Sequence, residues 1–420
     1  MSIMLSIQNL IKNLGPGLLF ASTAIGTSHL VLSTKAGAQY GWIMIIPIIL
    51  ANILKYPFFE FGVRYTNITN KTLIEGYLNR GMAYLIFYAI ITLFSTFTIL
   101  AALYVVTSGL LINLFQLNNT PVSIIAGGLF ILICVLLIVG RYKFLEISLK
   151  YVISILFLAL LVTTILVIVN GKVTAVENFE TPIIFNEVGI LFLIGLMGWM
   201  PTAVEASGWI SLWSIEKFKN SKQKPTLKEA LQEFKFGYFT TAILAIFFMI
   251  IGWFTLYGTN TELSNSAVVF ADQLVQLFTV NIGSWAYIFI AIAAFATMFS
   301  TCITAHDALS RVSVDILSLL FPKKEVIKNN GFTIGVLLLA VINFMVISIF
   351  SANMGILVAL ATFVSFVMAP IIGYMNLKNV MSREIPETDR PNRNLQILTY
   401  LGIVFLTLFS IYYCWMILFK

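Results

Sequence analysis

The segment GLMGWMPTAVEASG, residues 195–208, interrupts a long apolar stretch with Gly, Pro, Thr and Glu. Proline and glycine leave backbone groups of a helix without partners, and lipid offers those groups no hydrogen bond. Such an interruption is tolerated at membrane depth only where it faces protein or a water-filled cavity. The segment therefore predicts a helix that is broken near its middle.

A second interruption, IGTSHL at residues 25–30, lies in the middle of the first apolar stretch, five spans earlier. Two broken helices in corresponding positions of two five-helix halves indicate inverted repeats with a solute site near the bilayer midplane. Each break exposes N–H and C=O groups of half-helix ends to that site. The alternative is that these small residues only let neighbouring helices pack closely.

The composition excludes a water-soluble protein. Hydrophobic residues make up 59% of the 420 residues and charged residues only 10%, and the mean hydropathy is +0.96. Soluble domains are about half apolar and about a quarter charged. The three cysteines lie in apolar stretches and predict buried thiols rather than disulfides or a metal site. We therefore expect an integral membrane protein.

Apolar runs of about 20 residues, the length that crosses the hydrocarbon core, predict an all-α fold of about 11 transmembrane helices. The expected spans are 15–37, 42–66, 82–115, 122–140, 146–169, 188–215, 236–258, 283–316, 332–350, 354–377 and 396–419. They divide into two inverted five-helix repeats, 14–169 and 188–378, and an extra C-terminal helix, 396–420. The expected connections are the N-terminal segment 1–13, the loop 170–187, the basic linker 216–235 and the loop 379–395.

Most of the 25 Lys and Arg residues fall in alternate connections, which explains the net charge of +7 without nucleic-acid binding. Positively charged loops stay in the cytoplasm. The charge pattern therefore predicts a protein of the cell (plasma) membrane with a cytoplasmic N-terminus and an external C-terminus.

The order of the spans and three short motifs resemble the Nramp (natural resistance-associated macrophage protein) family of divalent-metal transporters, which share the leucine-transporter fold. The matching motifs are Gly15-Pro16-Gly17, Ala36-Gly37-Ala38 with Tyr40-Gly41, and Met200-Pro201. The resemblance covers most of residues 14–378. It implies a leucine-transporter-like scaffold with helices 1 and 6 broken.

The chain departs from this family at the residues that hold the metal. The family's Asp-Pro-Gly-Asn motif, whose Asp and Asn bind metal, aligns with residues 26–29 (GTSH). Its Met-Pro-His-Asn motif aligns with residues 200–203 (MPTA), so only the metal-binding Met is retained. The resemblance therefore implies a divergent branch with a retained scaffold and a remodelled site.

The two breaks supply the expected substrate-binding residues, which are Gly26, Thr27, Ser28, His29, Met197, Met200, Pro201, Thr202 and Ala203. This set offers N–H and hydroxyl donors but no carboxylate. A divalent cation needs anionic ligands to leave water, so the set favours a small anion such as bicarbonate or a short carboxylate. Two alternatives stay open: a divalent metal at an atypical site made by His29 and Met200, and a neutral or zwitterionic solute.

Other polar residues in the spans predict coupling, gating or cavity lining. An intramembrane carboxylate is costly and by default functional. The leucine-transporter fold also implies hydroxyl ligands for sodium in the eighth span. The expected coupling and gating residues are Glu205, Lys35, Ser300, Thr301 and Thr304, and Thr362 and Ser365 are expected to line the cavity. No cofactor is expected beyond a coupling ion, Na⁺ or H⁺.

Two charged pairs have the spacing of structural ion pairs. Glu60 and Arg64, and likewise Asp307 and Arg311, are four residues apart on expected helices. We expect both pairs to stabilise the fold rather than relay protons.

Together these features predict a secondary active transporter and not an enzyme. The sequence has no HExxH or GxSxG motif of the kind a membrane-embedded enzyme uses. Channels build their pores from filter loops or oligomeric symmetry, whereas paired broken helices in one chain favour alternating access. A receptor with the same fold stays open. The expected partners are a small ionic substrate and the lipid bilayer, with no nucleic acid, and we expect a monomer.

Overall fold

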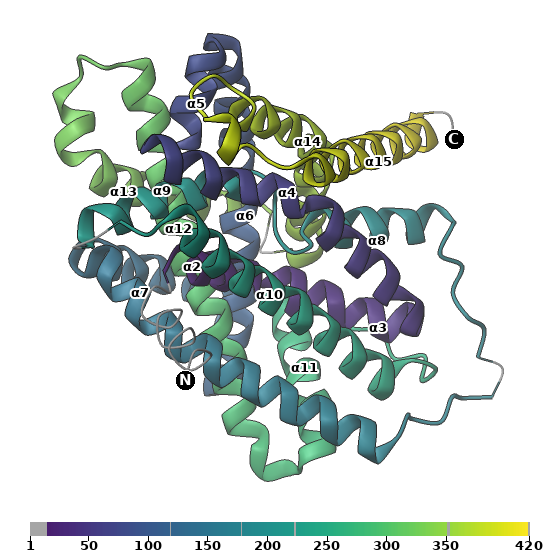
Figure 1. Ribbon diagram of the computed structural model, residues 1–420. Helices are drawn as coiled ribbons and strands as arrows, with labels where there is room; N and C mark the ends of the chain where they lie inside the picture. The colour runs from purple at the N-terminus through teal and green to yellow at the C-terminus, as the bar shows by residue number, and fades with distance from the viewer. Residues whose placement is uncertain (1–14, 118, 178, 222–223, 351–352, 419–420) are drawn as a thin grey trace, which may run out of the picture.

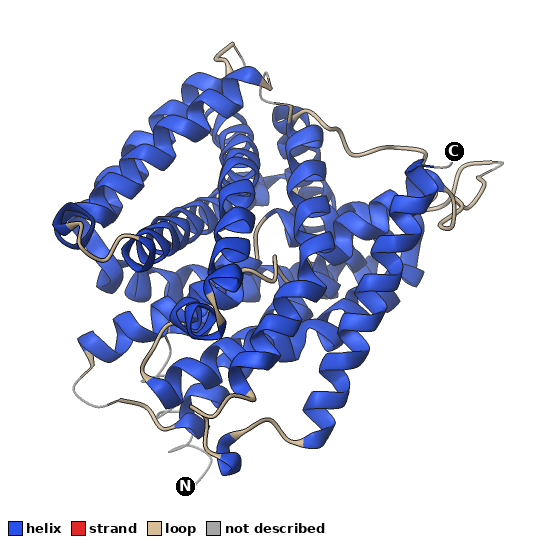
Figure 2. Cartoon of the chain, turned by 90° about the horizontal axis from the view of Figure 1, so that it is seen from above, coloured by secondary structure: helices blue, strands red, loops and turns tan. Residues whose placement is uncertain are grey.

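The structure is a computed structural model that describes residues 15–117, 119–177, 179–221, 224–350 and 353–418. Every regular element in these ranges is a helix (Figure 2). Nine helices among the described residues are long and apolar enough to cross a membrane. The all-α membrane fold predicted from composition is confirmed.

The first half of the chain forms α2 (Pro16–Ala24), the π-helix η1 (Ser28–Ser33), α3 (Thr34–Tyr40), the 3-10 helix η2 (Gly41–Met44), α4 (Ile45–Thr69), α5 (Leu73–Arg80), α6 (Met82–Phe115) and α7 (Val122–Asn170). The second half forms α8 (Glu187–Gly198), α9 (Ala206–Asn220), α10 (Leu227–Leu256), α11 (Ala267–Ile282), η3 (Ser284–Ala286), α12 (Tyr287–Leu320), α13 (Glu325–Ile349), α14 (Met354–Val380), η4 (Glu387–Asp389) and α15 (Arg393–Leu418).

Helix α7 differs from the prediction of two separate spans. It runs without interruption for 49 residues (Figure 1), which at 1.5 Å per residue is about 74 Å and more than twice the thickness of a hydrocarbon core. Each of its two apolar parts, Val122–Gly140 and Ile153–Asn170, has the length of a span. Residues 141–146 contain neither glycine nor proline, so nothing in the sequence ends the helix there.

The expected basic linker, 216–235, is mostly helical. Helix α9 continues to Asn220 and α10 begins at Leu227. Thr226 and Glu229 form a capping box that starts α10 within the polar segment. A second capping box, Thr72 with Glu75, starts the short helix α5 in a region predicted as loop. Helix starts of this kind consist of polar residues, so a prediction based on apolar runs does not include them.

The two halves of the chain interleave. Helix α10 packs against α2, η1 and α3, and α12 packs against α2 and α6. Helix α14 packs against α4, α6 and α8. Figure 1 shows α2 near the centre of the molecule, crossed by α10. Unbroken helices from both halves therefore pack against the two broken spans.

Close backbone contacts through glycine fix α10 against the first span. A Cβ atom on Gly37 would lie 1.9 Å from the carbonyl oxygen of Met249, and one on Gly252 would lie 2.2 Å from that of Thr34. A Cβ on Gly237 would lie 2.3 Å from the carbonyl oxygen of Gly17. Small residues allow membrane helices to approach this closely.

We expect Gly252→Ala to lower the thermal unfolding midpoint in detergent, because the added methyl group would force α10 and α3 apart. Overpacking of this kind costs about 1–3 kcal/mol. Gly128→Ala is the matched control, because nothing lies within 4 Å of a Cβ at that helical position. Equal midpoints for the two variants would contradict the close contact.

Candidate functional site

The first break separates α2 from the π-helix η1. Helix α2 ends at Ala24, and the Gly26 N–H binds the carbonyl oxygen of Ala24 at 2.8 Å instead of continuing the α-helical pattern. A Cβ on Gly26 would lie 2.6 Å from the Thr301 side chain of α12, so only glycine fits this contact. The predicted break is present, although Ser28 and His29 already belong to η1.

The second break separates α8 from α9. Helix α8 ends at Gly198, the segment 199–205 is not a regular helix, and α9 begins at Ala206. The indole N–H of Trp199 donates to the Ser365 hydroxyl of α14 at 3.1 Å. The break predicted in the sixth span is therefore present as well.

A lysine from α4 holds the end of α8. The Lys55 ammonium donates to the carbonyl oxygens of Met197 at 3.0 Å, Gly198 at 2.9 Å and Thr202 at 3.0 Å. Lys55 is 0% exposed. Lys55 lies inside an apolar span, but its role could not be predicted, because its partners lie far away along the chain.

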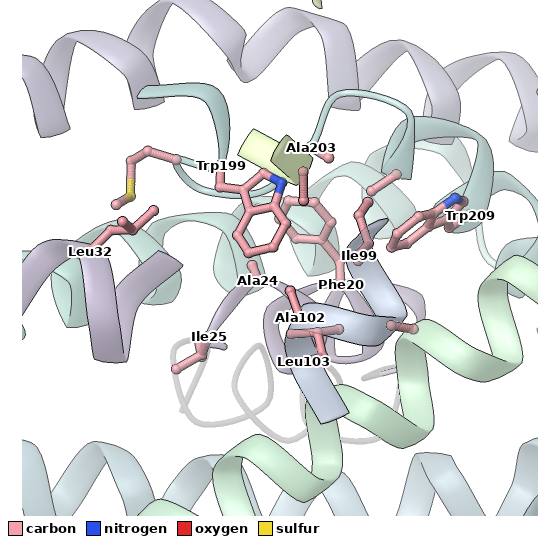
Figure 3. Packing of buried hydrophobic residues seen from close by; sticks show 14 of the residues in the cluster. Phe20, Ala24, Ile25, Leu32, Ile99, Ala102, Leu103, Trp199, Ala203 and Trp209 are labelled. Atoms are coloured by element: carbon pink, nitrogen blue, oxygen red, sulfur yellow. The ribbon is translucent and has the colours of Figure 1, made fainter. Parts of the chain in front are cut away.

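The two breaks face each other. The Ser28 hydroxyl lies 3.3 Å from the carbonyl oxygen of Pro201. Beside this contact is a cavity of about 20 Å³, which is room for roughly one water molecule. Its lining consists of Thr23, Thr27, Ser28, Ile99, Leu103, Trp199, Thr202, Ala203 and Trp209. Figure 3 labels five of these side chains, those of Ile99, Leu103, Trp199, Ala203 and Trp209. We call this space the central cavity.

Two of the lining residues have a buried donor with no hydrogen-bond partner in the described structure. The two donors are the hydroxyl of Thr27 and the indole N–H of Trp209. A buried polar group without a partner costs about 1–3 kcal/mol, so such groups mark places where a ligand or water completes the site. Thr23 differs, because its hydroxyl donates to the Leu19 carbonyl oxygen at 2.9 Å.

The structure places some predicted substrate-binding residues at the central cavity and others outside its lining. Thr27, Ser28, Thr202 and Ala203 line it. The other five, Gly26, His29, Met197, Met200 and Pro201, do not. The π-helical turn directs the His29 ring toward α10, where Nε2 lies 2.9 Å from the Thr241 carbonyl oxygen and Nδ1 lies 2.8 Å from the Ser28 hydroxyl.

The sequence interpretation missed five lining residues, Thr23, Ile99, Leu103, Trp199 and Trp209. Trp199 had a local signal, since it lies near the middle of the expected span 188–215 rather than at an interface, where membrane tryptophans are enriched.

Glu205 lies behind the second break. The Ser95 hydroxyl donates to Glu205 Oε1 at 2.5 Å, and the Tyr88 hydroxyl donates to the Glu205 carbonyl oxygen at 2.9 Å. The other carboxylate oxygen is buried without a hydrogen-bond partner. Its charge interacts with that of Lys55. This carboxylate faces α4 and α6 and does not line the central cavity.

Oxygen atoms gather where α2 ends against α12. The Thr301 hydroxyl lies 2.8 Å from the Ser22 carbonyl oxygen, 3.3 Å from that of Ile25 and 3.1 Å from that of Thr297. The Ser22 hydroxyl donates to that of Ser300 at 3.2 Å. We call these five oxygen-bearing residues the α2–α12 oxygen cluster. Thr304, expected beside them, bonds only carbonyl groups of its own helix.

A wider pocket of about 290 Å³ lies between α3, α8 and α14 and reaches Gly195 and Thr362. Lys35 lines it and donates to Asn265 Oδ1 at 2.8 Å. Thr362 therefore lines this pocket, whereas Ser365, one turn further along α14, is held by Trp199 beside the central cavity.

Both predicted ion pairs are present. Arg311 Nε lies 2.8 Å from Asp307 Oδ2, and Arg64 Nε lies 3.0 Å from Glu60 Oε2. Trp213 also donates to Asp307 at 2.8 Å, so this pair ties α9 to α12. The expected structural pairing is confirmed.

A family model described as natural resistance-associated macrophage protein-like (Nramp) matches residues 17–416. The chain belongs to the Nramp family. An uncharacterized protein of Pasteurella multocida (strain Pm70) is 33% identical to it over 407 residues, which are 95% of this chain and 90% of that protein. Members of the Nramp family are membrane transporters, and so the chain is a membrane protein of a transporter family.

Solved structures share the fold. A mutant of the Eremococcus coleocola manganese transporter matches with a TM-score of 0.67 and 15% identity, covering 94% of this chain and 84% of that one. Mhp1, a nucleobase-cation-symport-1 family transporter in a closed conformation, matches with a TM-score of 0.64 and 15% identity, covering 96% and 92%. These matches confirm the leucine-transporter-like architecture.

The glycines that open α2 are bound by an acidic residue of α10. The Glu233 carboxylate accepts from the N–H groups of Gly15 and Gly17, each at 2.8 Å. A carboxylate at a helix N-terminus is favoured by the free N–H groups and the helix dipole. Glu233 therefore anchors α2 to α10.

We expect Glu233→Gln to lower the thermal unfolding midpoint, because a hydrogen bond to a charged group contributes about 1.5–3 kcal/mol. Glu229→Gln, one turn earlier on the same helix, is the control. Glutamine also fits a capping box, so that variant keeps its stability. If both variants unfold at the wild-type temperature, Glu233 does not anchor α2.

Proposed function

We propose that the protein is a secondary active transporter that carries a small anion, such as bicarbonate or a short carboxylate, by alternating access. The observation that carries this proposal is the central cavity, which lies between the two breaks and is lined by Thr27 and Trp209, two residues with unpartnered buried donors. In a state of the transport cycle in which the two breaks move apart and enlarge the cavity, an anion would accept hydrogen bonds from both groups. Each such bond to a charged ligand contributes about 1.5–3 kcal/mol.

The dipoles of the half-helices also favour a negatively charged substrate. Helix α9 begins beside the cavity residues Thr202 and Ala203, so its positive end is close to the substrate. The opposing negative end of α8 is neutralised by the Lys55 ammonium. The positive end of α9 therefore supports an anion at the central cavity.

A divalent cation finds few ligands here. The lining of the central cavity includes no acidic side chain, His or Met. No group of three or more His, Cys, Asp or Glu residues in the described part of the chain is arranged to hold a metal ion. Desolvating a divalent cation without anionic ligands is costly. This supports the anion over the metal alternative.

We propose sodium as the coupling ion, bound by the α2–α12 oxygen cluster. One hydroxyl proton of Thr301 serves three nearby carbonyl oxygens, so most of their lone pairs stay available. Neutral oxygen ligands suit a monovalent hard cation. Because Ser22 and Ile25 lie at the end of α2, sodium binding here would set the position of the first break.

We further propose a monomer in the cell membrane with the N-terminus in the cytoplasm and the C-terminus outside. The alternation of Lys and Arg along the connections supports this orientation.

We expect wild-type protein in liposomes to accumulate labelled acetate or bicarbonate with saturation and counterflow, and to carry no Mn²⁺. Trp209→Phe and Thr27→Val should each lower kcat/KM for the anion about tenfold or more, because each removes one donor to a charged ligand. Trp285→Phe and Thr98→Val are the matched controls, since Trp285 is 69% exposed and Thr98 bonds only within its own helix.

Mn²⁺ uptake without anion uptake would favour a metal transporter, and uptake of neutral amino acids alone would favour a zwitterionic solute. Wild-type anion uptake by both cavity variants would show that the substrate binds elsewhere.

The sodium proposal predicts that a sodium gradient drives anion uptake and that Thr301→Val raises the sodium concentration for half-maximal uptake about tenfold or more, because one hard oxygen ligand is lost. Thr163→Val is the control, since that hydroxyl bonds only the Ala159 carbonyl oxygen of its own helix. Uptake driven equally well by a proton gradient, with no sodium response, would assign the coupling to H⁺.

A further inference from the structure

Lys55 occupies an unusual position for a charged residue. It lies on α4, has no exposure, and directs its ammonium at the end of α8 rather than at any aqueous surface. An ammonium has three donors, and all three find carbonyl oxygens, those of Met197, Gly198 and Thr202. A buried charge persists only when it is compensated in this way.

The three oxygens do not all belong to one helix end. Met197 and Gly198 lie in the last turn of α8, whereas Thr202 lies beyond it in the non-helical segment. A residue that only capped α8 would need the first two alone. The ammonium instead sits in a cage formed by both sides of the bend, with the oxygens at 2.9–3.0 Å.

A carboxylate lies near the cage without forming an ion pair of 4 Å or less with Lys55. The Glu205 carboxylate interacts electrostatically with Lys55, and its Oε2 atom is buried without a hydrogen-bond partner. Three carbonyl oxygens, with a carboxylate nearby, are the kind of oxygen environment that hard metal cations prefer. In this chain the position of such a cation is filled by the ammonium of Lys55, which is part of the protein.

We propose that Lys55 is a specificity-determining residue that takes the cation position of the α8–α9 break and thereby excludes divalent metal ions from it. This inference rests on the proposed function in that both place the pathway between the two breaks. Removing the ammonium vacates three carbonyl oxygens and leaves the charge of Glu205 uncompensated. The vacated cage then becomes a site for a divalent cation with oxygen ligands.

The experiment is a titration of purified protein in detergent with Mn²⁺, in which free Mn²⁺ is measured by its electron paramagnetic resonance signal. We expect no saturable binding by the wild type and one site in Lys55→Ala, with an affinity at least about tenfold higher than any wild-type binding. The double variant Lys55→Ala/Glu205→Gln should lose most of this gain, because it lacks the carboxylate ligand.

Lys35→Ala is the matched control. It removes another buried lysine from the first half of the chain, but that lysine binds the Asn265 side chain and holds no carbonyl cage. It should therefore gain no Mn²⁺ site. Lys55→Gln is a second variant, because its amide still donates to the carbonyl oxygens but carries no charge. It should gain a weaker Mn²⁺ site than Lys55→Ala.

Folded Lys55→Ala and Lys55→Gln proteins that bind Mn²⁺ no better than the wild type would overturn the proposal. Loss of the native fold in both would make Lys55 a structural residue only and would overturn it as well. A wild type that carries no anion, alongside a Lys55→Ala variant that gains a Mn²⁺ site, would reject the proposed function and leave this inference standing.

Discussion

The central constraint on this structure is that backbone groups at two helix breaks need partners where lipid supplies none. Side chains from unbroken helices provide them. Lys55 of α4 binds the carbonyl groups that α8 leaves free, and the Thr301 hydroxyl of α12 lies beside those that α2 leaves free. Without these contacts each break would bury several unsatisfied carbonyl oxygens, and a continuous helix would be more stable. The two breaks are therefore stable because polar side chains of α4 and α12 lie where the carbonyl groups are left free.

Local features of the sequence were sufficient to predict where the two helices break. Gly26 and the pair Met200-Pro201 interrupt apolar runs, and both breaks occur there. The span 82–115 matches α6 for the same reason, since a glycine and a polar segment bound it. The continuity of α7 was not predictable from hydropathy, because charged residues in the middle of a run indicate a loop even when the backbone stays helical.

The directions of the side chains within the breaks could not be predicted from the sequence. His29 was expected at the substrate site, but a π-helix has a wider turn than an α-helix and so changes which residues share a face. Its ring meets the Thr241 carbonyl oxygen on α10 instead. Trp209 and Lys55 depend on contacts between residues far apart in the chain. Such contacts follow from how the halves interleave, which no local pattern encodes.

The glycine contacts along α10 have a mechanical consequence. Gly17 meets Gly237 and Thr34 meets Gly252, so α10 touches both segments of the broken first span through bare backbone. Side chains join the same elements, since the Phe20 ring of α2 packs against Phe234 and Tyr238 of α10. Helix α10 therefore braces the segments on both sides of the first break, and a tilt of α2 would have to carry α10 with it.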